Sequence, residues 1–258
     1  MTFANILLLS LIQGITEFIP VSSSAHLMLF PFLLGNEYQG AIVDVFAHMG
    51  SLLAVMLFYR KEIKKLVLSL FKKNADRNML FALIIATMPI VIFGLIVVVT
   101  HIKFRSVNMI IYTSIIFGIF LYLADKFGSK KLSIKKMSLK NAFYIGLAQI
   151  LSAIPGVSRS GITSTCGLML NYKREEILKF SFLLSIPTII CVTGGGILEF
   201  IMKPETISLA PLLSIMFFSF IFSFLTIKFM MSKIKRISFK PFAIYRICLG
   251  IFLYIYLK

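Results

Sequence analysis

Long apolar segments, rather than any single motif, limit what this chain can fold into. A bilayer core of about 30 Å is crossed by about 20 helical residues. Six uninterrupted segments come close to that length, at residues 41–59, 79–99, 107–125, 177–198, 210–230 and 241–257. We therefore expect an all-α polytopic membrane protein with six transmembrane helices. The 258 residues leave no room for a separate soluble domain.

Two further apolar regions, at 3–34 and 141–170, are interrupted at their middle by a proline and small polar residues. Non-helical backbone at membrane depth is tolerated only where protein or a water-filled cavity satisfies its hydrogen bonds. Each region is therefore expected to form a re-entrant helix-loop-helix hairpin whose tip faces an internal site.

The charge distribution supports a membrane protein and gives its orientation. Only 14% of the residues are charged, against about 25% in soluble domains. Of the 27 Lys and Arg residues, 20 lie in four clusters between apolar regions, at 60–77, 126–140, 171–179 and 231–240. Such clusters mark cytoplasmic loops, so the net charge of +17 does not indicate a nucleic-acid partner.

With these clusters in the cytoplasm, both ends of the first hairpin lie outside the cell and both ends of the second lie inside. This opposite insertion predicts an inverted repeat whose hairpin tips meet near a pseudo-two-fold axis. The Ile-Pro pairs at 19–20 and 154–155 are 135 residues apart, and the following spans keep nearly the same spacing. The expected units are a first repeat at 1–125, a basic cytoplasmic loop at 126–140 and a second repeat at 141–258.

Glu17 is a carboxylate at membrane depth, where an ionisable residue indicates function. Gln13 lies one helical turn before it, so an amide oxygen and a carboxylate could together hold Mg²⁺ or Ca²⁺. The alternative is that Glu17 pairs with Arg159 and stabilises the contact between the hairpins. Both interpretations can hold at different steps of a reaction.

Arg159 follows Gly156 and stands between Ser158 and Ser160 in the second hairpin. A guanidinium fork, two hydroxyls and the N–H groups of a helix start near Gly161 form a phosphate-binding arrangement.

The first hairpin carries three consecutive hydroxyls, Ser22, Ser23 and Ser24, which could bind phosphate in the same way or only cap a helix. His26 can share a face with these serines and could act as a general base or as a nucleophile toward phosphorus. A histidine in a membrane also often makes only an interhelical hydrogen bond. Asp44 and His48, four residues apart on the next span, are expected to support the site from behind.

The two interrupted regions resemble the signature regions of the undecaprenyl-diphosphate phosphatase family, the bacitracin-resistance membrane phosphatases of bacteria. The matching strings are QGITEFIPVSSSAH at 13–26 and IPGVSRSGIT at 154–163, and FAHMGSLLAV at 46–55 is also similar. Length and span pattern agree with that family over essentially the whole chain.

The resemblance implies hydrolysis of the terminal phosphate of a C55 polyprenyl diphosphate, assisted by a divalent cation. It implies that Glu17 is the essential carboxylate, His26 a catalytic imidazole, Ser22 or Ser23 the nucleophile and Arg159 the phosphate clamp. Ser158, Ser160 and Thr163 would complete the phosphate cradle. Position 13 is often Glu in the family and is Gln here, which removes one charge from any metal site.

The expected product is the monophosphate carrier used in peptidoglycan synthesis, and the expected location is the bacterial inner membrane, with the site open to the outer side. A homodimer is one possible assembly of the chain. Inverted repeats with broken helices are also the architecture of secondary transporters, so a polyprenyl-phosphate flippase or small-anion carrier is the alternative. The nucleophile stays open among serine, histidine and water.

Overall fold

The computed structural model describes residues 1–35, 38–73, 76–100, 106–202 and 208–257. Helices account for the regular structure of these residues, apart from one isolated bridge between Leu132 and Tyr172. Five of the helices are long and apolar enough to cross a membrane: α3 (Ala41–Phe58), α5 (Asn78–Thr100), α6 (Val107–Phe127), α9 (Arg174–Met202) and α10 (Leu209–Lys233). The chain is therefore a polytopic all-α membrane protein.

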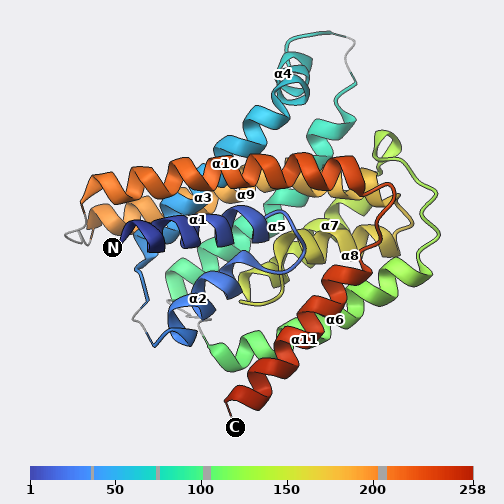
Figure 1. Ribbon diagram of the computed structural model, residues 1–258. Helices are drawn as coiled ribbons and strands as arrows, with labels where there is room; N and C mark the ends of the chain where they lie inside the picture. Colours follow the sequence, from blue (N-terminus) through green and yellow to red (C-terminus); the bar gives the residue numbers. More distant parts are fainter. Residues whose placement is uncertain (36–37, 74–75, 101–105, 203–207, 258) are drawn as a thin grey trace.

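The last expected span forms helix α11 (Lys240–Tyr256), which at 17 residues is shorter than those five. Helix α4 (Arg60–Ser69) covers most of the first basic cluster and projects away from the bundle (Figure 1). Glu62 in α4 forms an ion pair of 2.9 Å with Lys179 in α9, and this contact holds the start of α4 against α9.

Each interrupted apolar region forms two helices with a short break between them. The first region gives α1 (Phe3–Thr16) and α2 (Ser23–Leu33). The second gives α7 (Leu139–Ile150) and α8 (Arg159–Met169), with a short 3₁₀ turn at Leu151–Ala153. The two pairs are called the first and the second hairpin below.

The two hairpin tips share a backbone feature that the sequence pattern does not reveal. The residue before the second helix of each hairpin is a serine with positive φ, 78° at Ser22 and 71° at Ser158. Non-glycine residues adopt this conformation rarely, and strain of this kind concentrates at functional sites. Both tips therefore reverse the chain in the same way.

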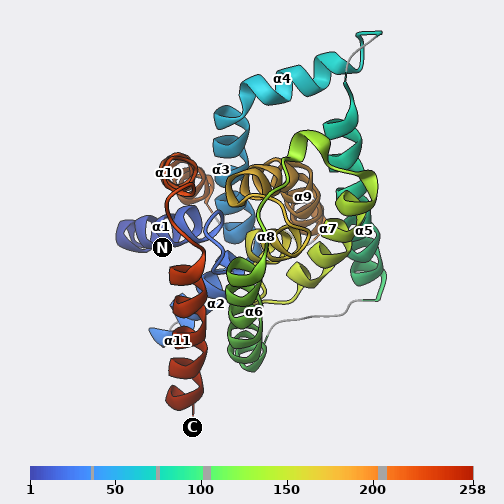
Figure 2. The same cartoon turned by 90° about the vertical axis from the view of Figure 1, so that its right-hand side faces the viewer.

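The longer helices enclose the hairpins. Helix α3 packs against α9 and α10, α1 packs against α10, α5 against α7, and α6 against α11. In Figure 2, α8 is at the centre, between α9, α7 and α6. Both tips are consequently surrounded by helices, which is what non-helical backbone at membrane depth requires.

A buried carboxylate ties three helices together at the basic end of the bundle. Asp125, near the end of α6, accepts hydrogen bonds from Arg174 Nη2 at 3.1 Å and from the Phe239 N–H at 2.9 Å. These partners lie at the starts of α9 and α11, where a negative charge is favourable. The contacts of Asp125 thus fix the ends of these three helices.

Close packing between α3 and α10 gives a stability prediction. A Cβ atom at Gly50 would meet the Met216 carbonyl oxygen at 2.2 Å, whereas a Cβ at Gly94 would meet nothing within 4 Å. Overpacking costs about 1–3 kcal/mol. We expect Gly50→Ala to lower the free energy of unfolding in detergent by about 2 kcal/mol. Gly94→Ala is the matched control in α5 and should leave the free energy of unfolding unchanged or raise it. Equal stability of the two variants would contradict the close packing at Gly50.

Candidate active site

Glu17 is the centre of the polar contacts between the hairpins. It follows the last residue of α1, and its backbone N–H bonds to the Gln13 carbonyl. Its carboxylate is buried and accepts hydrogen bonds from Arg159 Nη2 at 3.0 Å and from the Ser23 hydroxyl at 2.6 Å. His48 Nε2 lies 3.5 Å from the same oxygen that Ser23 contacts. One carboxylate therefore meets a guanidinium, a hydroxyl and an imidazole.

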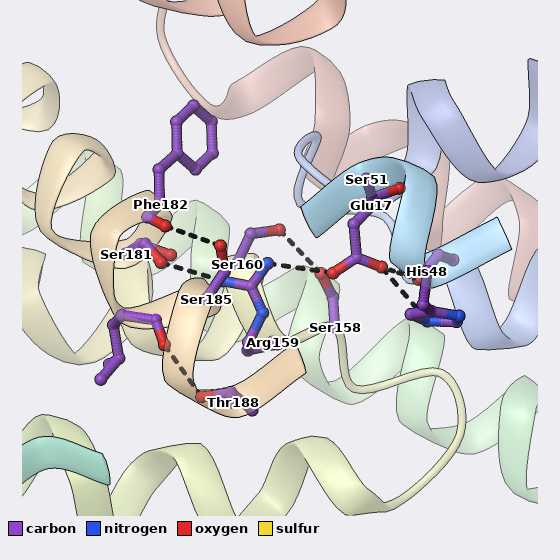
Figure 3. A network of polar contacts seen from close by, with 12 residues as sticks. Glu17, His48, Ser51, Ser158, Arg159, Ser160, Ser181, Phe182, Ser185 and Thr188 are labelled. Atoms are coloured by element: carbon purple, nitrogen blue, oxygen red, sulfur yellow. Dashed lines mark hydrogen bonds and ion pairs between the residues drawn. The ribbon is translucent and has the colours of Figure 1, made fainter. Parts of the chain in front are cut away.

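Arg159 is the first residue of α8 and points from the second hairpin to the first (Figure 3). Its Nη1 donates to the carbonyl oxygen of Ser181 at 2.9 Å, which leaves Nη2 directed at Glu17. Both side chains of the ion pair are less than a tenth exposed. In such surroundings an unpaired charge is expensive, so each residue needs the other in place.

Further hydrogen bonds hold the two tips together. The Gly156 N–H donates to the Ser22 hydroxyl at 3.2 Å, and the Ser160 hydroxyl donates to the Ile19 carbonyl oxygen at 3.1 Å. Three residues that the sequence placed in catalysis or phosphate binding thus make the contact between the hairpins.

The cavity beside this contact has a volume of about 570 Å³. Seven of the candidate residues line it: Glu17, Ser22, Ser23, Ser24, His48, Ser158 and Arg159. Apolar side chains from α5 and α9, including Val97 and Val192, complete the wall. A cavity with a few converging polar groups and an apolar wall suits a ligand that has a charged head and a hydrocarbon tail.

The remaining candidates lie outside the cavity lining. Thr163 is fully buried, where its hydroxyl lies 2.8 Å from that of Ser181. Gly156 and Ser160 belong to the hairpin contact described above. Gln13, His26 and Asp44 are likewise not among the cavity-lining residues. Thr163 supports the start of α8 from behind, since its hydroxyl also donates to the Arg159 carbonyl oxygen at 2.8 Å.

The two candidate histidines, His26 and His48, are placed differently from what their spacing suggested. His48 lines the cavity and contacts Glu17, and its Nδ1 lies 2.7 Å from the backbone carbonyl of Asp44 rather than its carboxylate. The Asp44 carboxylate instead accepts from the Gln39 amide at 2.8 Å and from the Tyr38 hydroxyl. His26 bonds at both ring nitrogens, with the Ser22 carbonyl and the Tyr245 hydroxyl, each at 2.7 Å.

Gln13 and Glu17 supply the oxygens that a hard cation would use. The Gln13 amide nitrogen donates to Glu17 at 3.3 Å and to Ser51 at 3.1 Å, whereas its buried Oε1 has no partner. The described residues contain no group of three or more His, Cys, Asp and Glu side chains that could hold a metal. The chain thus offers a partial set of oxygen ligands, which a phosphate group could complete.

Sequence reasoning missed several small polar residues on the spanning helices. Ser51 in α3 bonds to Gln13 and to Ser223, at 3.1 and 2.9 Å. In the second half, Thr188 in α9 lies 3.5 Å from the Gln149 amide oxygen and also lines the cavity. Their signal was a buried hydroxyl inside an otherwise apolar segment, which is weak because such residues often serve only helix packing.

Comparison with known proteins adds independent findings. The family model described as "Bacitracin resistance protein BacA" matches residues 6–252. The chain is 42% identical to the Undecaprenyl-diphosphatase of Alteromonas mediterranea over 260 residues, covering 97% of both proteins. It is 41% identical to the protein of the same name from Roseobacter denitrificans, covering 99% of both.

The buried ion pair gives a testable coupling. Removing one partner of a buried pair costs about 3–5 kcal/mol, because the other charge stays buried without a partner. We expect Arg159→Met and Glu17→Gln each to lower the free energy of unfolding in detergent by about 3 kcal/mol. The double variant should be less destabilised than the sum of the two. Strict additivity in this double-mutant cycle would contradict a direct pair.

Proposed function

Because the chain belongs to the BacA family of bacitracin resistance proteins, we propose that it dephosphorylates undecaprenyl diphosphate at the contact between its two hairpins. The chain is an enzyme of the membrane, a phosphatase whose product is undecaprenyl phosphate. Recycling this lipid carrier serves cell wall synthesis and underlies bacitracin resistance. The location of the site rests on one observation. The side chains of Ser23 and Arg159 both contact that of Glu17 at the wall of the cavity.

The diphosphate head is bound by groups of both hairpins in this proposal. Arg159 faces the cavity together with Ser158 and Ser24. The N-termini of α2 and α8 add backbone N–H groups and the positive ends of their helix dipoles. The apolar wall at Val97 and Val192 suits the start of the polyprenyl chain.

Among the three nucleophiles left open by the sequence, the geometry favours Ser23. Its hydroxyl already donates to Glu17 at 2.6 Å, so the carboxylate can take the proton as the oxygen attacks the terminal phosphorus. The bond from this phosphorus to the bridging oxygen then breaks, and undecaprenyl phosphate leaves. The departing undecaprenyl phosphate takes the proton from Glu17. Water then attacks the phosphoserine, Glu17 accepts a proton from this water, and the bond from phosphorus to the Ser23 oxygen breaks. Inorganic phosphate leaves, and Glu17 returns the proton to the Ser23 oxygen.

Arg159 has two roles in this scheme. In the free protein it neutralises Glu17, and with substrate bound it neutralises charge that develops on the phosphoryl oxygens. In its protonated form His48, whose Nε2 lies 3.5 Å from Glu17, stabilises the carboxylate after Arg159 turns to the phosphate. His26 is held outside the cavity lining, which disfavours it as base or nucleophile.

A divalent cation, Mg²⁺ or Ca²⁺, is part of the proposal. Glu17 would hold it at the cavity together with phosphate oxygens of the substrate, and Gln13 would join with its amide turned so that Oε1 rather than Nε2 faces Glu17. When bound, such an ion supplies positive charge that stabilises the reacting phosphate.

The proposed location is the bacterial inner membrane, with the cavity open to the outer side. The cavity-lining residues Ala41 and Val97 lie at the ends of α3 and α5 that are remote from the basic cluster at 60–77. Since basic clusters stay in the cytoplasm, this arrangement favours access from outside.

An inverted repeat, with halves at 1–125 and 141–258 joined by the basic loop, is proposed for the same reasons. Helix α1 packs on α10 and its counterpart α7 packs on α5, the exchange of partners that such a repeat produces. Gln13 meets Ser51 in α3, and Gln149 meets Thr188 in α9. A homodimer stays a prediction. The flippase or anion-carrier alternative is not favoured, because the similar proteins are named as phosphatases.

Phosphate release tests the proposed chemistry. We expect purified protein in detergent to release inorganic phosphate from undecaprenyl diphosphate, and Ser23→Ala to lower the rate by about a thousandfold or more, as loss of a nucleophile does. Ser214→Ala in α10, where the Ser214 hydroxyl donates to the Ala210 carbonyl oxygen of its own helix, is the matched control and should keep full activity. Retention of activity in Ser23→Ala would rule out the serine.

Metal dependence is tested separately. A chelator should abolish release, and added Mg²⁺ or Ca²⁺ should restore it. Gln13→Glu places a second carboxylate one turn from Glu17, so we expect it to lower the Mg²⁺ concentration for half-maximal activity by about tenfold, since ligand charge sets affinity. Unchanged activity in chelator would remove the cation from the scheme.

A further inference from the structure

Two adjacent residues of α11 contact both hairpins. The Tyr245 hydroxyl lies 2.7 Å from His26 Nε2 in the first hairpin, and the two rings are stacked. Arg246 Nη2 donates to the carbonyl oxygen of Gly156 in the second hairpin, also at 2.7 Å. Helix α11 packs on α6 and stands outside the central helices (Figure 2). Neither Tyr245 nor Arg246 takes part in the reaction steps proposed above.

The two contacts belong to a closed ring. His26 Nδ1 lies 2.7 Å from the Ser22 carbonyl oxygen, and the Ser22 hydroxyl accepts the Gly156 N–H at 3.2 Å. The ring therefore runs from Tyr245 through His26, Ser22 and Gly156 to Arg246, which is covalently joined to Tyr245. It crosses between the hairpins at Ser22 and Gly156, the residues at the two tips.

The hydrogen bonds of His26 assign its protons. A carbonyl oxygen only accepts, so Nδ1 donates to Ser22. In the neutral ring Nε2 is then the acceptor, and the Tyr245 hydroxyl donates to it. Both ring nitrogens of His26 therefore have hydrogen-bond partners within the protein. His26 can link Tyr245 to Ser22 without contacting the substrate.

Arg246 is costly where it is. Its side chain is 1% exposed, and its Nε and Nη1 have no hydrogen-bond partner. No carboxylate of the described residues forms an ion pair with it, and its remaining contact is with the Thr113 carbonyl oxygen at 3.4 Å. A buried guanidinium kept at such a position marks a specific requirement rather than packing alone.

We propose that Tyr245 and Arg246 are positioning residues that hold the two hairpin tips in register for phosphoryl transfer. Ser22 directly precedes Ser23, and Gly156 lies three residues before Arg159, so a shift between Ser22 and Gly156 moves the nucleophile relative to the clamp. This inference rests on the proposed phosphatase function. It assigns His26 a positioning role too, through the same ring.

The decisive variant is Tyr245→Phe, which removes one hydroxyl from a partly exposed side chain and should fold normally. Misplacement of reacting groups by even 1 Å can cost about a hundredfold in rate. We expect kcat for phosphate release to fall about tenfold with KM changed less than twofold, because alignment matters most in the transition state. Tyr256→Phe, the same substitution on the same helix, should match wild type.

Arg246→Lys keeps the charge and loses the planar fork, and should lower kcat by a similar factor. Because either change opens the same ring, the double variant should be little slower than the slower single variant. Wild-type kcat in Tyr245→Phe, or a double effect equal to the product of the single effects, would overturn the proposal.

Amide hydrogen exchange tests the ring without relying on activity. Peptides covering 19–26 and 154–160 should exchange about tenfold faster in Tyr245→Phe than in Tyr256→Phe, because Ser22, which accepts the Gly156 N–H, loses the support that reaches it through His26. Unchanged exchange at both tips would overturn the ring even if activity changed. If the wild-type protein releases no phosphate, the proposed function fails, while the exchange result still decides the ring.

Discussion

The ion pair between Glu17 and Arg159 is the interaction on which the rest of the structure depends. A charge at membrane depth has to be paired, and here the partners come from opposite halves of the chain. Each stands at a helix end: Glu17 follows α1 and Arg159 begins α8. Side chains at such ends can meet only if both helices stop inside the bundle. The broken hairpins are therefore the means of bringing these charges together.

Broken helices in turn need surrounding protein, and this requirement explains the packing of the longer spans. The tips satisfy each other through Ser22 with Gly156 and Ser160 with Ile19. The Arg159 guanidinium, hydroxyls of both hairpins and two helix N-termini line the cavity, where they can receive an anionic head group. The same backbone breaks that would destabilise a simple span thus supply the binding groups of a phosphatase.

Much of this could be predicted from the sequence because the bilayer restricts the possible structures. The apolar lengths predicted the helices, and the prolines and serines at 20–24 and 155–160 predicted the two breaks. Glu17 and Arg159 stood out as charges in apolar surroundings, and their pairing was one of the stated alternatives. The last apolar segment, at 241–257, likewise forms a helix, α11 at Lys240–Tyr256.

The roles of the neighbouring side chains could not be predicted, because they depend on the rotation of each helix. Spacing alone suggested that His26 faces the serines, whereas its ring faces Tyr245 on a helix more than 200 residues later in the chain. His48 was expected only to support the site, and instead it contacts Glu17. Arg246 showed only a positive charge within the last apolar segment, at 241–257.

The chemistry between the hairpins can be observed directly by trapping the phosphorylated enzyme. Undecaprenyl diphosphate labelled with ³²P in its terminal phosphate would be mixed with the protein and denatured within milliseconds. Attack by the Ser23 hydroxyl beside Glu17 predicts an acid-stable phosphoserine in the peptide that contains residue 23. An acid-labile label on His26, or the release of labelled phosphate with no labelled protein at any time, would contradict it.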